Sequence, residues 1–153
     1  MTSPNPAPEI EALQRVLAGQ HAAVYAYSVI GVHLSDPGQV STVRSLQAAH
    51  QATRDQLMAD LTARSVTPVT AAPTYSPTLP VTDAASARRW ALQLENDCAA
   101  AYRYLLTVTA SMTGSVTALR QLAIAGLTGS AQGSLTWRAL VTPATPTVPF
   151  PGT

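Results

Sequence analysis

Five side chains that can bind a metal ion stand at helical spacing within apolar segments of the chain: Gln20, Gln47, His50, Glu95 and Cys98. Dinuclear iron or manganese sites in helical bundles take one Glu from each of two helices and a Glu-x-x-His pair from each of two others. Gln47 and His50 have the spacing of such a pair, with an amide in place of the acid. Glu95 and Cys98 are also three residues apart, so both face the same side of a helix.

The charge of this set argues against a dinuclear centre. Glu95 is the one carboxylate expected to face inward, and it would meet a charge of about +4 from two divalent ions. The segment 116–140 contains neither an acid nor a histidine. We therefore predict no metal, no cofactor and no catalytic residue. The alternative is iron, manganese or zinc at an incomplete or mononuclear site made by His50, Glu95 and Cys98, with Gln20 and Gln47.

Without a metal, we expect a buried polar network formed by Gln20, His50, Glu95, Tyr27 and Tyr102. A buried amide or hydroxyl normally finds a hydrogen-bond partner, and a carboxylate on an apolar helix face needs a charged or polar neighbour. For Glu95 that neighbour would be His50, Tyr102 or water.

The remaining candidates have simpler interpretations. His21 and His33 fall off the apolar face of the first helix, so we expect them at a helix edge or on the surface. Cys98 is expected to be a small buried side chain.

The elements that position these residues follow from apolar periodicity and from proline. Apolar residues recur at intervals of three and four, which is typical of helices, and they predict helices over about 8–34, 40–64, 83–112 and 115–140. The segment at 36–38, Asp-Pro-Gly, is expected to end the first helix. We predict one domain, 1–142, followed by a proline-rich tail, 143–153.

The connector between the second and third helices predicts the topology. Residues 65–82 contain four prolines and no helical period. At about 3.3 Å per residue they could span about 60 Å, whereas a helix of 25 residues is about 38 Å long. The connector can therefore cross the whole bundle, so that two antiparallel hairpins are joined by one long crossover. This pattern predicts an all-α, ferritin-like four-helix bundle; an up-and-down bundle with a decorated loop is the alternative.

Composition excludes several classes of function. The net charge is +1, and the cations are scattered arginines with no lysine, so a nucleic-acid surface is not expected. The uncharged run 121–137 is too rich in Gly, Ser, Thr and Gln for a membrane span. The N-terminal residues do not resemble a secretory signal, and we expect a cytoplasmic protein. No motif of a hydrolase, kinase or dehydrogenase is present.

The predicted fourth helix contains Gly126, Gly129 and Gly133, and no acidic residue follows Asp97. Glycine costs about 1 kcal/mol relative to Ala in a helix interior, and it often marks a close approach of two backbones. We predict that these glycines lie in a homodimer interface. In the alternative, the tail folds back with Phe150 as an anchor and covers this face.

Several stretches carry a resemblance: GQHAAVYAYSVIGVHL, AAHQATRDQL, PTYSPTLPVTDAASA, LENDCAAAYRYL and the closing FPG. They resemble small ferritin-like domains of unknown function found in actinobacteria, in particular a mycobacterial conserved hypothetical protein. The resemblance covers nearly the whole chain. It implies a ferritin-like bundle, a dimer and no established activity.

Two classes of function are left. The first is an oligomeric structural or interaction protein without a complete dinuclear site, and the missing acids favour it. The second is a metal-dependent oxidoreductase or metal-handling protein with an incomplete or mononuclear site, which the spacing of His50 and Glu95 keeps open.

Overall fold

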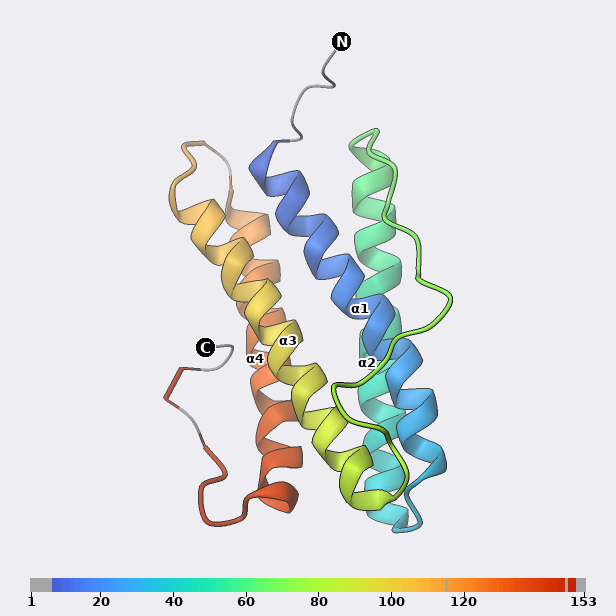
Figure 1. The fold of residues 1–153 in the computed structure, drawn as a ribbon. Coiled ribbons are helices and arrows are strands. Elements are labelled where there is room, and N and C mark those ends of the chain that lie inside the picture. Colours follow the sequence, from blue (N-terminus) through green and yellow to red (C-terminus); the bar gives the residue numbers. More distant parts are fainter. Residues whose placement is uncertain (1–6, 115, 148, 151–153) are drawn as a thin grey trace.

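The structure, a computed structural model, describes residues 7–114, 116–147 and 149–150. Over these residues the chain forms four helices and no strand (Figure 1): α1 (Pro8–Val32), α2 (Pro37–Ala63), α3 (Ala84–Ala110) and α4 (Thr117–Val141). The prediction of an all-α four-helix bundle is confirmed.

The connections produce two antiparallel hairpins. Short turns join α1 to α2 and α3 to α4, while residues 64–83 run the length of the bundle beside α1, so that α2 and α3 point in the same direction (Figure 1). The crossover is held to α1 by the amide of Gln14, which donates to the carbonyl of Thr67 and accepts from the backbone N–H of Val69, both at 2.7 Å. The crossover is therefore a docked part of the bundle.

The helix ends differ from the expected ends by up to three residues, and the largest difference is at α2. Pro37 does not break this helix but lies in its first turn. A backbone N–H at this position would have no intrahelical partner, so a proline here costs no hydrogen bond. Asp36 caps the helix by accepting from the backbone N–H of Gln39 at 2.8 Å. Ser115, the first residue of the fourth helix as predicted, lies outside the described residues, as do residues 1–6, 148 and 151–153 of the predicted domain and tail.

The start of α3 has a stronger cap. Asp83 and Ser86 form a capping box, in which the Asp83 carboxylate accepts from the backbone N–H of Ser86 at 2.7 Å and the Ser86 hydroxyl bonds back to the backbone N–H of Asp83 at 3.0 Å. Hydrogen bonding by Ser86 lowers the pKa of Asp83. Asp83 thus marks the boundary between the crossover and α3.

The core consists of two apolar clusters, one toward each end of the bundle. One contains Ile30, Trp90 and Trp137, and the other contains Leu17 and Leu105. Helix α1 packs on α2 and α3, and α3 packs on α4. Along their described lengths α2 and α4 barely touch each other, which leaves the fourth side of the bundle open.

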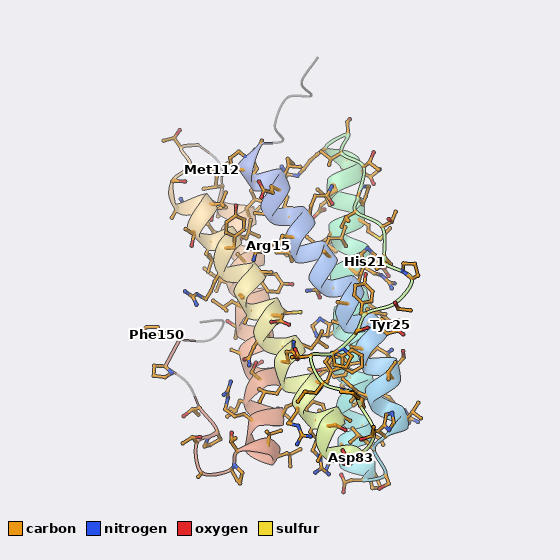
Figure 2. The ribbon with its side chains drawn as sticks, in the orientation of Figure 1. Arg15, His21, Tyr25, Asp83, Met112 and Phe150 are labelled. Carbon is orange, nitrogen blue, oxygen red and sulfur yellow. The ribbon has the colours of Figure 1, made fainter. Side chains whose placement is uncertain are left out.

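The position of His21 differs from the prediction. We expected a helix edge or the surface, but His21 is 8% exposed, because the crossover covers it and its Nε2 lies 3.0 Å from the carbonyl oxygen of Val69. Figure 2 shows His21 and Tyr25 on the side of α1 along which the crossover passes. Tyr25 also meets Tyr75 of the crossover, with ring centroids 5.6 Å apart. His33 is half-buried at the end of α1.

The tail turns back beside α4. Pro146 and Thr147 border a cleft together with Leu127 and Leu135 of α4. Phe150 is 72% exposed and lies away from the helices (Figure 2). The tail therefore covers part of one face of α4, but Phe150 is not buried there as the predicted anchor. No helix in the described part of the chain is long and apolar enough to cross a membrane.

Candidate functional site

A chain of buried polar side chains runs across the bundle, and two of its members, Tyr27 and Trp137, also belong to the apolar cluster that contains Ile30. Gln20 and Tyr27 come from α1, His50 from α2, Glu95 from α3 and Trp137 from α4. All five are buried; Gln20 and Glu95 are each 1% exposed. All four helices contribute to this centre.

Glu95 is the hub of the chain. Its Oε1 accepts from the hydroxyl of Tyr27 at 2.5 Å and lies 3.2 Å from Nε2 of His50. On the far side of the imidazole, Nδ1 of His50 lies 2.8 Å from Oε1 of Gln20. Three of the predicted network residues are thus connected to Glu95. Tyr27 and His50 contact it directly, and Gln20 is connected to it through His50.

Both ring nitrogens of His50 face oxygen atoms, Oε1 of Gln20 on one side and Oε1 of Glu95 on the other. A neutral imidazole donates through one ring nitrogen and an imidazolium through both. The contact with His50 gives the buried carboxyl group of Glu95 a polar partner, which a buried carboxylate needs.

Tyr27 closes the network on the side of α4. Nε1 of Trp137 donates to the Tyr27 hydroxyl at 3.0 Å, which leaves the phenolic proton for Glu95. Burial, with the Glu95 carboxylate adding to it, raises the pKa of Tyr27 well above its ordinary value. The Tyr27 ring also stacks on the imidazole of His50, with centroids 5.7 Å apart. Sequence reasoning missed Trp137, although an indole N–H on an inward face normally seeks an acceptor.

Two of the three glycines of α4 make room for side chains of α3. A Cβ at Gly133 would lie 2.6 Å from the carboxyl carbon of Glu95, and a Cβ at Gly126 would overlap the ring of Tyr102. A Cβ at Gly129 would meet nothing within 4 Å. The close approach at Gly126 and Gly133 is therefore internal to the chain, and it explains these two glycines without a second copy.

The other predicted site residues lie outside the hydrogen-bonded chain. Tyr102 is buried, but its hydroxyl bonds to none of the described residues. Gln47 donates to the carbonyl of Val24 at 3.0 Å, away from Glu95.

Cys98 faces α1 rather than the centre. Its thiol points to the carbonyl of Gly19 at 3.8 Å, and burial raises its pKa. Over the described residues, no three His, Cys, Asp or Glu side chains come close enough together to hold a metal ion. Among the described residues, His50, Glu95 and Cys98 thus do not come together as a three-ligand group.

A cleft of about 290 Å³ opens onto this centre between α2 and α4. Gln20, His50, Glu95 and Tyr102 are at its base. Its walls come from the two helices that do not pack on each other: Leu46, Ala49 and Thr53 of α2, and Leu122, Ala125, Gly126, Gly129 and Ser130 of α4.

Comparisons with known proteins place this architecture in a family. A crystal structure of a conserved hypothetical protein, rv2844, from Mycobacterium tuberculosis is similar to this chain, with 32% sequence identity and a TM-score of 0.78, over 89% of this chain and 98% of that one. No curated protein matches the sequence. The family model of a domain of unknown function, DUF4439, matches residues 12–153. The chain therefore belongs to the DUF4439 family.

Proposed function

We propose that this protein is a non-catalytic bundle of ferritin-like descent that acts by binding another protein chain, in the first instance a second copy of itself. The ferritin-like descent is supported by the single long crossover, because few other helical bundles need one. The Glu-x-x-His spacing retained as Gln47 and His50 also supports it.

The buried centre argues against catalysis. Tyr27 and His50 both contact Oε1 of Glu95, and Gln20 bonds to the far side of the His50 ring, so one oxygen of the carboxylate already has two partners. A metal ion at Glu95 would find one carboxylate, which is too little charge for a dinuclear centre. A metal-handling function would need ligands from a partner.

The observation that carries the proposal is the outer face of α4. Ile124 is 56% exposed, and Leu135 is 43% exposed although it borders the cleft beside the tail. These two residues lie about three turns apart on the same side of the helix. An exposed apolar face without charges is typical of a surface that meets another protein.

The two arginines of α4 do not charge this face. Arg120 donates to the carbonyl of Thr109 at 2.6 Å, and Arg138 donates to Oδ1 of Asn96 at 3.3 Å. Both guanidinium groups are thus held against α3. Since α4 contains no acidic residue and no lysine, two copies could approach along this face without burying an unpaired charge.

Sedimentation velocity tests the proposal. The wild-type chain should sediment as a dimer from about 1 to about 100 µM, and Leu135→Arg, which places a charge on the proposed interface, should shift it to a monomer by mass action. Gln51→Arg, at an exposed position on α2, is the control and should leave the dimer intact. A wild-type monomer throughout this range would refute self-association.

A further inference from the structure

The cleft between α2 and α4 has the features of a binding site for a small molecule. Its volume of about 290 Å³ lies near the lower end of ligand pockets, which start at about 300 Å³. Leu46, Leu122 and Ala125 make its walls apolar. Gly129 keeps it open, because this position could carry a side chain without meeting any neighbour.

Oε2 of Glu95, at the base of the cleft, has no hydrogen-bond partner among the described residues. Both hydrogen bonds of the Glu95 carboxylate go to Oε1, from Tyr27 and His50, and none of the described residues donates to Oε2. Every fully buried nitrogen or oxygen atom of the described side chains has a partner. Oε2 must therefore reach open space, and the space that Glu95 lines is this cleft. An oxygen atom on a residue that is 99% buried thus remains available to accept a hydrogen bond.

The cleft also offers a donor. The hydroxyl of Tyr102 bonds to none of the described residues, although the ring lines the cleft beside Gly126. Burial raises the pKa of Tyr102, so the hydroxyl keeps its proton at neutral pH. A ligand group that both donates and accepts would match Glu95 and Tyr102 together.

The charges around the cleft restrict the ligand further. His50 and Glu95 are the acidic and basic side chains among the lining residues, and they already contact each other, with Nε2 of His50 3.2 Å from Oε1 of Glu95. A cationic or anionic ligand would therefore enter an apolar cleft without a free counter-ion, which is costly. An uncharged ligand avoids this cost.

We propose that the cleft between α2 and α4 binds a small uncharged molecule with a compact apolar body and a hydroxyl group, which donates to Oε2 of Glu95 and accepts from Tyr102. The body would lie between Leu46 and Leu122. This site is on the side of α4 that faces α2, and it does not include Ile124 or Leu135 of the proposed dimer face. The two proposals can therefore fail separately.

Three probes of nearly the same shape test the chemistry: cyclohexanol, cyclohexylamine and cyclohexanecarboxylate. In titrations followed by ¹H–¹⁵N correlation spectra, cyclohexanol should produce saturable shifts at Gly126 and Gly129, with a Kd on the order of 1 to 10 mM for a ligand of this size. The amine and the acid, which are charged at pH 7, should bind at least about tenfold more weakly, since an unpaired charge is costly to bury.

Two variants locate the site. Gly129→Leu fills the cleft with a side chain and should abolish the saturable shifts. Gln121→Leu adds the same side chain to an exposed position of α4 outside the cleft and should leave the Kd for cyclohexanol unchanged. Circular dichroism should show that both variants remain folded.

Three results would overturn the proposal. The first is no saturable binding of cyclohexanol, and the second is equal binding of cyclohexanol to Gly129→Leu and to the wild type. The third is tighter binding of the amine or the acid than of the alcohol, which would refute the uncharged class.

Discussion

At the scale of single residues, the centre of the bundle is organised around one carboxylate. Glu95 accepts from Tyr27 and pairs with His50. Trp137 donates to Tyr27, and Gln20 bonds to His50. Within hydrogen-bonded networks of this kind, the loss of one member leaves others buried without partners. The network should therefore be sensitive to the loss of Glu95 in particular.

Glu95→Ala should lower the free energy of unfolding by about 3 to 5 kcal/mol, the usual cost of leaving one member of a buried ion pair unpaired. Urea denaturation measures the change. Glu95→Gln is the matched control: it keeps the shape and an oxygen acceptor for Tyr27, so its loss should be smaller. A loss below about 1 kcal/mol for Glu95→Ala would contradict the role of Glu95 as the hub.

The sequence predicted part of this centre. Gln20, His50 and Glu95 could be assigned to it because each is a polar residue at an inward position of a periodic helix. Trp137 and the gap at Gly133 could not be assigned, because they depend on how α4 is rotated against α3. The sequence of α4 contains no acid or histidine that would mark its inward face.

At the scale of the elements, α4 fits against α3 by omitting side chains. Gly133 lies against the Glu95 carboxylate, and Gly126 lies against the Tyr102 ring, whereas Gly129 faces open space. The three glycines of one helix thus have different surroundings. Substitution by alanine should therefore change the free energy of unfolding differently at these positions.

Gly129→Ala should raise the free energy of unfolding by about 0.5 to 1 kcal/mol, because alanine is the better helix former and its Cβ meets no neighbour here. Gly133→Ala should lower it by about 1 to 3 kcal/mol, because the new methyl group overlaps the Glu95 carboxylate. Thermal or urea denaturation of the two variants gives the comparison. Equal effects at both positions would show that Glu95 does not pack against Gly133.

The cap of α3 gives a prediction about pH. Hydrogen bonding by Ser86 lowers the pKa of Asp83 in the folded chain, so the ionised cap stabilises the fold above the unfolded pKa of about 3.9. This contribution is lost as the pH falls through the lowered folded pKa. Asp83→Ala should therefore have a lower Tm than the wild type at pH 7, and the difference should shrink as the pH falls below about 4.

Asp83→Asn provides the control for this experiment. Asparagine can also cap a helix but does not titrate, so the Tm difference between Asp83→Asn and Asp83→Ala should be nearly independent of pH. A difference between the wild type and Asp83→Ala that stays constant from pH 7 to pH 2 would contradict a cap through the ionised carboxylate.

At the scale of the whole molecule, local signals in the sequence were sufficient for the topology. Apolar periodicity predicted the helices, and the prolines of residues 65–82 predicted the crossover. Both signals depend only on residues that are close together in the sequence. The path of the crossover was not predictable. It covers His21 because of contacts between residues about 50 positions apart, such as those of Val69 with Gln14 and with His21. Periodicity contains no information about such contacts.

The open side of the bundle is also a property of the whole molecule. Since α2 and α4 barely touch along their described lengths, the centre around Glu95 is accessible from one direction, through the cleft. The same opening that we propose for an uncharged ligand would admit a metal ion. The content of metal in the native protein therefore decides between the two functional classes.

The central claim is that Glu95 is held by hydrogen bonds from the protein's own side chains and does not bind a metal. The most direct test is the metal content per chain, measured by plasma mass spectrometry on untagged protein purified without chelator after growth with added iron, manganese and zinc. We predict less than about 0.1 metal ion per chain, since one carboxylate and one imidazole form a weak site. A stoichiometric metal that is lost in both Glu95→Ala and His50→Ala would contradict the claim and would indicate a metalloprotein.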